Sequence, residues 1–80
     1  MNTNFINIYP NPAKNILYIE NTTRITMLIL NQRGELVKEQ AFEPGTNTLD
    51  ISVYEDGVYI LRAIGNSGTL VRRLVKMKEN

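Results

Sequence analysis

The sequence predicts a small all-β protein, a seven-stranded antiparallel sandwich. Short runs of apolar and β-branched residues recur at intervals of roughly ten residues, and segments rich in Gly, Asn and Pro separate them. No segment of useful length has the period of an amphipathic helix. Short strands at this spacing are typical of a β-sandwich.

The most apolar run, residues 57–64, is expected to be an inner strand. Six of its eight side chains are apolar and Arg62 is its only charge, so both faces should be at least partly covered. Asp56-Gly57-x-Tyr59 at its entrance is similar to the tyrosine corner of immunoglobulin-like sandwiches, in which the tyrosine hydroxyl bonds to upstream backbone. We therefore expect an immunoglobulin-like sandwich.

Four strands are expected between the N-terminus and residue 42. Residues 5–9 form the first, and Pro10-Asn11-Pro12 ends it, because proline lacks a donor and restricts the preceding residue to extended geometry. A rigid, polyproline-like crossing is expected there. Strands over residues 15–20, 24–31 and 35–42 follow, and the register of the last one is left open.

The turns and the remaining strands complete the pattern. Asn31-Gln32-Arg33-Gly34 has hairpin chemistry, with Gly34 expected at positive φ. Pro44-Gly45 is a second turn signal, before a strand over 46–52 in which Leu49, Ile51 and Val53 alternate. A corner at 53–56 enters the central strand, and a last strand covers 69–77. The side chains expected inside are Leu17, Ile19, Ile25, Met27, Ile29, Leu49, Ile51, Tyr59 and Leu61.

Length and composition exclude several classes of function. Eighty residues provide one domain, taken as residues 1–80, and a net charge of +1 implies no nucleic-acid partner. Without His or Cys the common metal ligands and nucleophile pairs are absent, so we expect no enzyme, no metal site, no cofactor and no small-molecule substrate. Apolar runs do not exceed four residues, as in Met27-Leu28-Ile29-Leu30, and no signal peptide is visible in residues 1–15.

Three groups of side chains are candidate binding sites: a set of carboxylates, a set of tyrosines and two segments of opposite charge. Asp50, Glu55 and Asp56 could form a carboxylate pair or a calcium site, but strand and corner chemistry accounts for them better. Tyr9, Tyr18 and Tyr54 could form a carbohydrate platform, although packing is the more frequent role. Residues 39–56 carry five acids and no base, and residues 62–78 carry five bases and no acid. These are either solvated faces attracting each other across neighbouring strands, or a basic recognition surface on the last strand.

Several stretches in order resemble a known family, the type A C-terminal sorting domain of the type IX (Por) secretion system. The opening is Tyr9-Pro10-Asn11-Pro12-Ala13 followed by Asn15-x-Leu17-x-Ile19. A hairpin motif spans Met27 to Val37 and includes Gly34, with Asn31 where the family more often has Asp. Residues 45–52 and Asp56-Gly57-Val58-Tyr59-Ile60 follow, and Arg72-Arg73-Leu74-Val75-Lys76 is the basic ending.

The resemblance implies a non-catalytic signal at the end of a larger exported protein. Such a signal would pass the periplasm, be recognised by the outer-membrane translocon and typically be cleaved by a sortase-like peptidase, leaving the cargo at the cell surface or secreted. The expected recognition residues are Arg72, Arg73, Lys76 and Lys78, on a basic last strand at a sheet edge. The alternatives are a carbohydrate-binding module or a structural fibronectin-like module of an extracellular protein.

Overall fold

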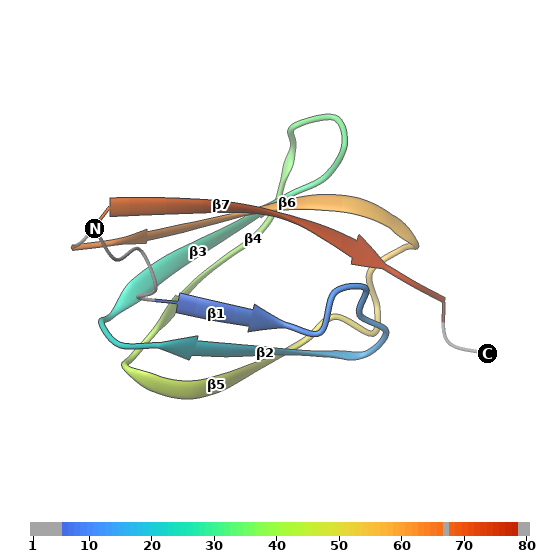
Figure 1. The fold of residues 1–80 in the computed structure, drawn as a ribbon. Coiled ribbons are helices and arrows are strands. Elements are labelled where there is room, and N and C mark those ends of the chain that lie inside the picture. Colours follow the sequence, from blue (N-terminus) through green and yellow to red (C-terminus); the bar gives the residue numbers. More distant parts are fainter. Residues whose placement is uncertain (1–5, 67, 79–80) are drawn as a thin grey trace.

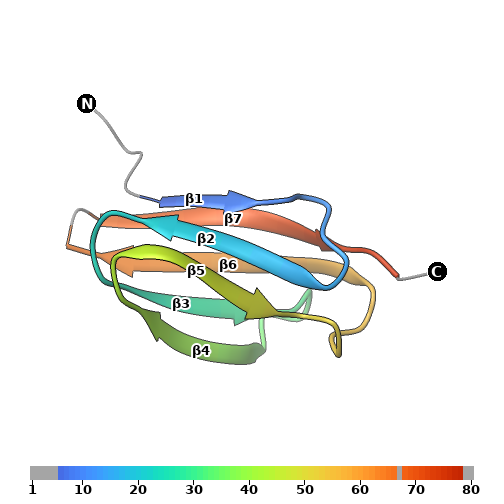
Figure 2. The ribbon, with the colours of Figure 1, turned by 90° about the horizontal axis from the view of Figure 1, so that it is seen from below.

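The computed structural model describes residues 6–66 and 68–78, which fold into seven strands in two antiparallel sheets (Figures 1 and 2). One sheet has three strands in the order β1-β2-β5, and the other has four in the order β4-β3-β6-β7. The expected positions of Phe5 in the first strand and Ser67 in the last turn lie outside the described residues. The strands are β1 (Ile6–Tyr9), β2 (Ile16–Asn21), β3 (Ile25–Leu30), β4 (Leu36–Phe42), β5 (Gly45–Asp50), β6 (Gly57–Gly65) and β7 (Gly68–Lys76).

The connections make this an immunoglobulin-like sandwich. The chain changes sheet between β2 and β3, between β4 and β5, and between β5 and β6, while β1–β2, β3–β4 and β6–β7 are antiparallel neighbours. Strand β6 lies between β3 and β7, as expected of an inner strand. The predicted fold class is therefore confirmed.

The core lies between the two sheets and follows the alternation of each strand. All nine side chains expected inside are at most 7% exposed. Val53 is the exception to the alternation from Leu49 and Ile51, because it is 87% exposed. The chain leaves β5 after Asp50 and turns, and the Tyr54 N–H donates to the Ile51 carbonyl at 3.0 Å.

The hairpin between β3 and β4 has the predicted chemistry. Gly34 has φ 82°, a conformation that side chains with a Cβ rarely adopt, so the expected positive φ is confirmed. The Asn31 side-chain oxygen accepts the N–H groups of Arg33 and Glu35 at 2.9 and 3.0 Å. The open register of β4 is explained by an irregularity between Ile29 and Leu30 in its pairing with β3.

The expected polyproline-like crossing is wrong. Both the Tyr9-Pro10 and the Asn11-Pro12 peptide bonds are cis, whereas a polyproline II segment contains trans bonds, and the chain bends here between β1 and β2. The segment still reaches the other sheet, since Ala13 forms a parallel bridge with Lys76 of β7.

Candidate recognition surface along the last strand

Strand β7 is an edge strand, and one half of its edge is covered by the loop between β1 and β2. The Asn11 side-chain Nδ2 donates to the Arg73 carbonyl at 2.6 Å, and the Val75 N–H donates to Asn11 Oδ1 at 3.0 Å. The Ala13 N–H donates to the Val75 carbonyl at 2.9 Å, and the Met77 N–H donates to the Ala13 carbonyl at 2.8 Å. Residues 11–13 therefore act as a short extra strand beside residues 73–77.

The other half of the β7 edge has no backbone partner among the described residues. Alternate residues of a strand direct their backbone groups to the same side, so those of Thr69 and Val71 point outward like those of Arg73. Among the described residues, no other segment forms a backbone hydrogen bond with these two positions. The open groups make this half suitable for pairing with an extended segment of another protein.

The four basic residues expected to form the recognition surface do not lie on one face. Arg73 points to the outer face of the four-stranded sheet, and Arg72 points to the opposite side, toward the three-stranded sheet. Lys78 follows the strand and is exposed.

Lys76 differs from these three because it is buried, with 4% of its surface exposed. Its side-chain Nζ donates to the Met77 carbonyl at 3.2 Å, so it behaves as part of the packed interior. The expectation that its charge is freely exposed is therefore wrong. Lys76 shares the inward face of β7 with Leu74, which is 1% exposed.

Arg72 borders an open hollow of about 570 Å³ between β7 and one end of the three-stranded sheet. Glu20 lines the same hollow, but no ion pair joins it to Arg72 among the described residues. Arg72 is exposed there, whereas the half-buried Glu20 carboxylate accepts a hydrogen bond from the Tyr9 hydroxyl at 2.8 Å. The other lining residues of the hollow are Ile6, Asn7, Asn21, Thr22, Gly45 and Thr46.

The predicted tyrosine corner is present at the entrance of β6. The Tyr59 hydroxyl donates to the Glu55 carbonyl at 2.7 Å, and burial raises the pKa of Tyr59 above its ordinary value. Gly57 has φ 145°, and a Cβ added there would lie 3.6 Å from the Gln32 side-chain nitrogen. The corner is thus placed against the β3–β4 hairpin, which supports the start of β6.

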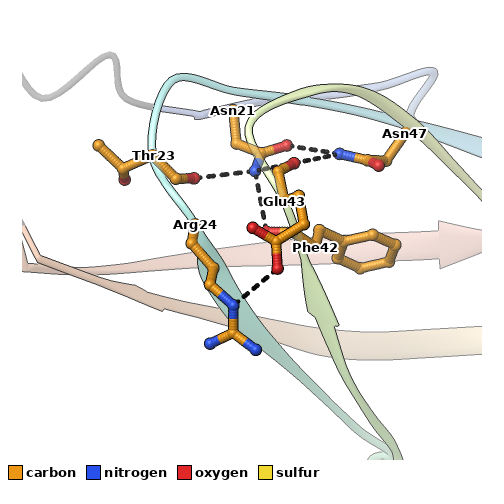
Figure 3. Close-up of polar contacts among 6 residues, drawn as sticks. All are labelled: Asn21, Thr23, Arg24, Phe42, Glu43 and Asn47. Carbon is orange, nitrogen blue, oxygen red and sulfur yellow. Dashed lines mark hydrogen bonds and ion pairs between the residues drawn. The ribbon is translucent and has the colours of Figure 1, made fainter.

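A polar network that the sequence did not reveal joins two connections at the opposite end of the sandwich (Figure 3). Asn21 is 4% exposed, and its Nδ2 donates to the carbonyls of Thr23, Phe42 and Glu43 at 2.9, 3.3 and 3.0 Å. Asn47 Nδ2 donates to Asn21 Oδ1 at 2.9 Å. We expected only a turn at Asn21, and no periodic signal marks it as buried.

The three tyrosines considered as a carbohydrate platform are not together. Tyr9 and Tyr18 stack at 5.4 Å on the outer face of the three-stranded sheet, and the Tyr9 hydroxyl donates to Glu20 at 2.8 Å. That hydrogen bond raises the pKa of Tyr9. Tyr54 instead packs beside Tyr59 at 5.6 Å, and its buried hydroxyl has no partner among the described residues. The three-ring platform is therefore not formed.

The acidic residues also remain separate. The described residues contain no cluster of three or more acids that could hold a metal ion. Hydrogen bonds from Ser52, first from its side chain and then from its backbone, lower the pKa of Asp50. Across the described residues the one ion pair joins Arg24 to Glu43 at 2.9 Å, so the acids of residues 39–56 form none with the bases of residues 62–78. Strands β4 and β7 lie at opposite edges of their sheet, so the expected attraction across neighbouring strands is wrong for these two strands.

The fold and this surface define a class of protein. The chain is an immunoglobulin-like sandwich whose accessible features are a half-open strand edge, exposed cations and a polar hollow, which suits recognition by another protein. Within the described residues, no helix is long and apolar enough to cross a membrane.

The comparison with known families then gives the identity. Residues 7–77 match the family model of the secretion system C-terminal sorting domain, and the chain belongs to this family, the sorting signals of the type IX (Por) system. The resemblance to this family that the sequence motifs indicated is therefore confirmed. No curated protein matches the chain. Such a domain is a signal for export to the cell surface or for secretion.

The residues of the family motif have structural positions. Pro10 and Pro12 flank Asn11, which binds β7, and Tyr9 stacks on Tyr18. The remaining positions, Gly34, Gly57 and Tyr59, form the hairpin and the tyrosine corner. In this structure the motif thus holds β7 and the β6 entrance in place.

Proposed function

We propose that residues 1–80 form one C-terminal domain of a longer exported protein and direct that cargo through the type IX system. The cargo passes from the periplasm through the outer-membrane translocon, and a sortase-like peptidase then removes the domain. The single observation that carries the proposal is the family match over residues 7–77. The domain acts as a recognised surface and has no catalytic role.

The recognised element is β7 with its exposed cations. Thr69 and Val71 offer open backbone groups, and Arg72, Arg73 and Lys78 are exposed near the same strand. An extended acidic segment of the machinery can pair with the open half-edge while the cations attract its carboxylates. Lys76 is buried and supports the strand from inside.

The test is a reporter fused ahead of Met1 and produced in a host that has the machinery, with reporter measured in periplasm and medium. Deletion of residues 72–80 should leave the reporter in the periplasm. A milder variant replaces Arg72, Arg73 and Lys78 by Gln, which should reduce export while the domain stays folded, because exposed charges contribute little to stability.

A matched control removes the same charge elsewhere. Lys14, Arg33 and Lys38 are also exposed, and their joint replacement by Gln should leave export unchanged. Full export of the truncated chain would contradict the proposal and return the domain to a structural role. Equal loss in both triple variants would show that net charge, and not β7, is recognised.

A further inference from the structure

The outer faces of the two sheets differ in composition. The three-stranded sheet directs mostly polar side chains outward, including Asn7, Glu20, Thr48 and Asp50, as is usual for a solvated antiparallel sheet. The four-stranded sheet directs apolar side chains outward from three of its strands, β3, β6 and β7. They are Leu28, Leu30, Val58, Ile60, Ile64, Val71 and Val75.

This apolar outer face is accessible. Ile64 and Val71 are 42% and 52% exposed, and the other apolar side chains of this face are half-buried. In Figure 1 the face points upward, and of the described segments the β3–β4 hairpin rises beside it. Contiguous apolar surface of this kind on a small domain marks an interaction site.

Two arginines lie within the apolar surface. Arg62 has Leu28 on one neighbouring strand and Val71 on the other, and Arg73 is paired in register with Ile60. Neither guanidinium forms an ion pair or a side-chain hydrogen bond among the described residues. The acid on the outward side of this sheet is Glu39, which lies on the edge strand β4, two strands from Arg62.

The charges decide which occupant fits. A lipid bilayer would cover Arg62 with hydrocarbon, which is costly because the charge is surrounded by apolar residues and does not lie at the rim. A second copy of this face would bring two more arginines and only one glutamate. A protein surface that carries carboxylates among apolar side chains can pair with Arg62 and cover its neighbours at once.

We propose that the outer face of β3, β6 and β7 is a docking surface for such an acidic, apolar surface on a protein of the secretion machinery. This inference rests on the proposed function and adds a second contact area beside the open edge of β7. Arg62 is its centre, with Ile64 and Val71 as the apolar part. Because β7 belongs to both areas, one partner can pair with its edge and cover the outer face.

The experiment uses the reporter fused to the full chain. Arg62→Glu should lower export by about tenfold or more, since it places like charges opposite each other in the docked state. Arg62→Lys should retain most of it. The double variant Ile64→Ser, Val71→Ser should also lower export. Circular dichroism and thermal unfolding of each purified domain should show a folded sandwich.

Matched controls use other surfaces. Lys14→Glu makes the same charge change on the β1–β2 loop, and Ile16→Ser removes an apolar side chain that is 37% exposed on the outer face of the other sheet. Both should be exported like the unchanged chain. If they lose export as strongly as the outer-face variants, the inference is overturned.

The remaining outcomes separate the alternatives. An unchanged chain that is not exported would overturn the proposed function and this inference with it. Normal export of Arg62→Glu, or of the double serine variant, would overturn the inference alone. Binding of the purified domain to anionic phosphatidylglycerol vesicles that Arg62→Glu abolishes would favour a membrane. A concentration-dependent dimer that the same variant disrupts would favour self-association.

Discussion

The two ends of the sandwich are held together in different ways. At one end, the buried side-chain amide of Asn21 joins the β2–β3 connection to the β4–β5 connection by hydrogen bonds. At the opposite end, the hydrogen bonds between connections and strands come from three residues, Asn11, Ala13 and Tyr59. Figure 1 shows the first end on the left and the second on the right. Asn21 is inaccessible, while Asn11 is exposed.

The two ends should respond differently to the loss of one side-chain hydrogen bond. A carbonyl that loses a buried partner stays unsatisfied, whereas one at an exposed site can bond to water. The left end therefore depends mainly on the buried amide of Asn21, whereas the right end is joined by several separate hydrogen bonds, of which those of Asn11 lie at the surface.

The largest effect is expected for Asn21→Ala. The change removes the side-chain donor to the Phe42 carbonyl and one of the two partners of the Glu43 carbonyl and of the Asn47 amide, which still bond to each other at 2.9 Å, so it should lower the free energy of unfolding by about 2 kcal/mol. Urea unfolding measures it. Asn47→Ala is the control and should cost less, because Asn47 is only half-buried. Equal costs would contradict the dependence of this end on the buried amide of Asn21.

Tyr59→Phe should have the next largest effect. It removes the hydroxyl that donates to the Glu55 carbonyl and should cost about 1 to 1.5 kcal/mol. The neighbouring Tyr54→Phe is a matched control, since the Tyr54 hydroxyl is buried without a partner among the described residues. Its removal should leave the melting temperature unchanged or raise it. A larger loss for Tyr54→Phe than for Tyr59→Phe would contradict the role of the corner.

Asn11→Ala should cost about 1 kcal/mol or less, because water can replace its bonds to Arg73 and Val75. Amide hydrogen exchange gives a local measurement. The Val75 N–H should lose protection, while the Met77 N–H, which donates to the Ala13 carbonyl, should keep it. Loss of protection at both would mean that Asn11 alone holds the loop against β7.

The smallest effect is a pH dependence at Asp50. Hydrogen bonds from Ser52 lower its pKa in the folded state, so its stabilising contribution is present above the ordinary value of 3.8 and is lost as the pH falls through the folded value. Asp50→Ala should therefore melt slightly earlier than the unchanged chain at neutral pH. The difference should shrink in acid, and a difference that grows there would contradict the assignment.

Much of the fold could be predicted because alternation and turn residues are local signals. Leu17 and Ile19 in β2, the hairpin glycine and the tyrosine corner all follow from short stretches of sequence. The prediction that Val53 continues the inward alternation of Leu49 and Ile51 was wrong because alternation does not reveal where a strand ends. The prediction of a polyproline-like crossing at Pro10 and Pro12 was wrong because the isomer of each X–Pro peptide bond depends on the surrounding fold.

The recognition surface was less predictable because it depends on contacts between distant residues. Asn11 binds residues more than sixty positions away, and Asn21 is buried by two connections that meet only in the folded chain. The burial of Lys76 had one available signal, since it shares the face of Leu74, but its charge favoured an exposed position. The separation of Arg72 from Arg73 follows directly from the two-residue period of a strand.

The hydrogen bonds between residues 11–13 and residues 73–77 form only in a chain that extends to the end of β7. In a copy interrupted before Arg73 by proteolysis or early termination, the loop at Asn11 has no strand to bind, and the first half of β6, residues 57–60, loses its partner in the sheet. If β7 is recognised as proposed, such a copy lacks part of the recognised surface. Export would then select complete chains through the geometry of the signal itself.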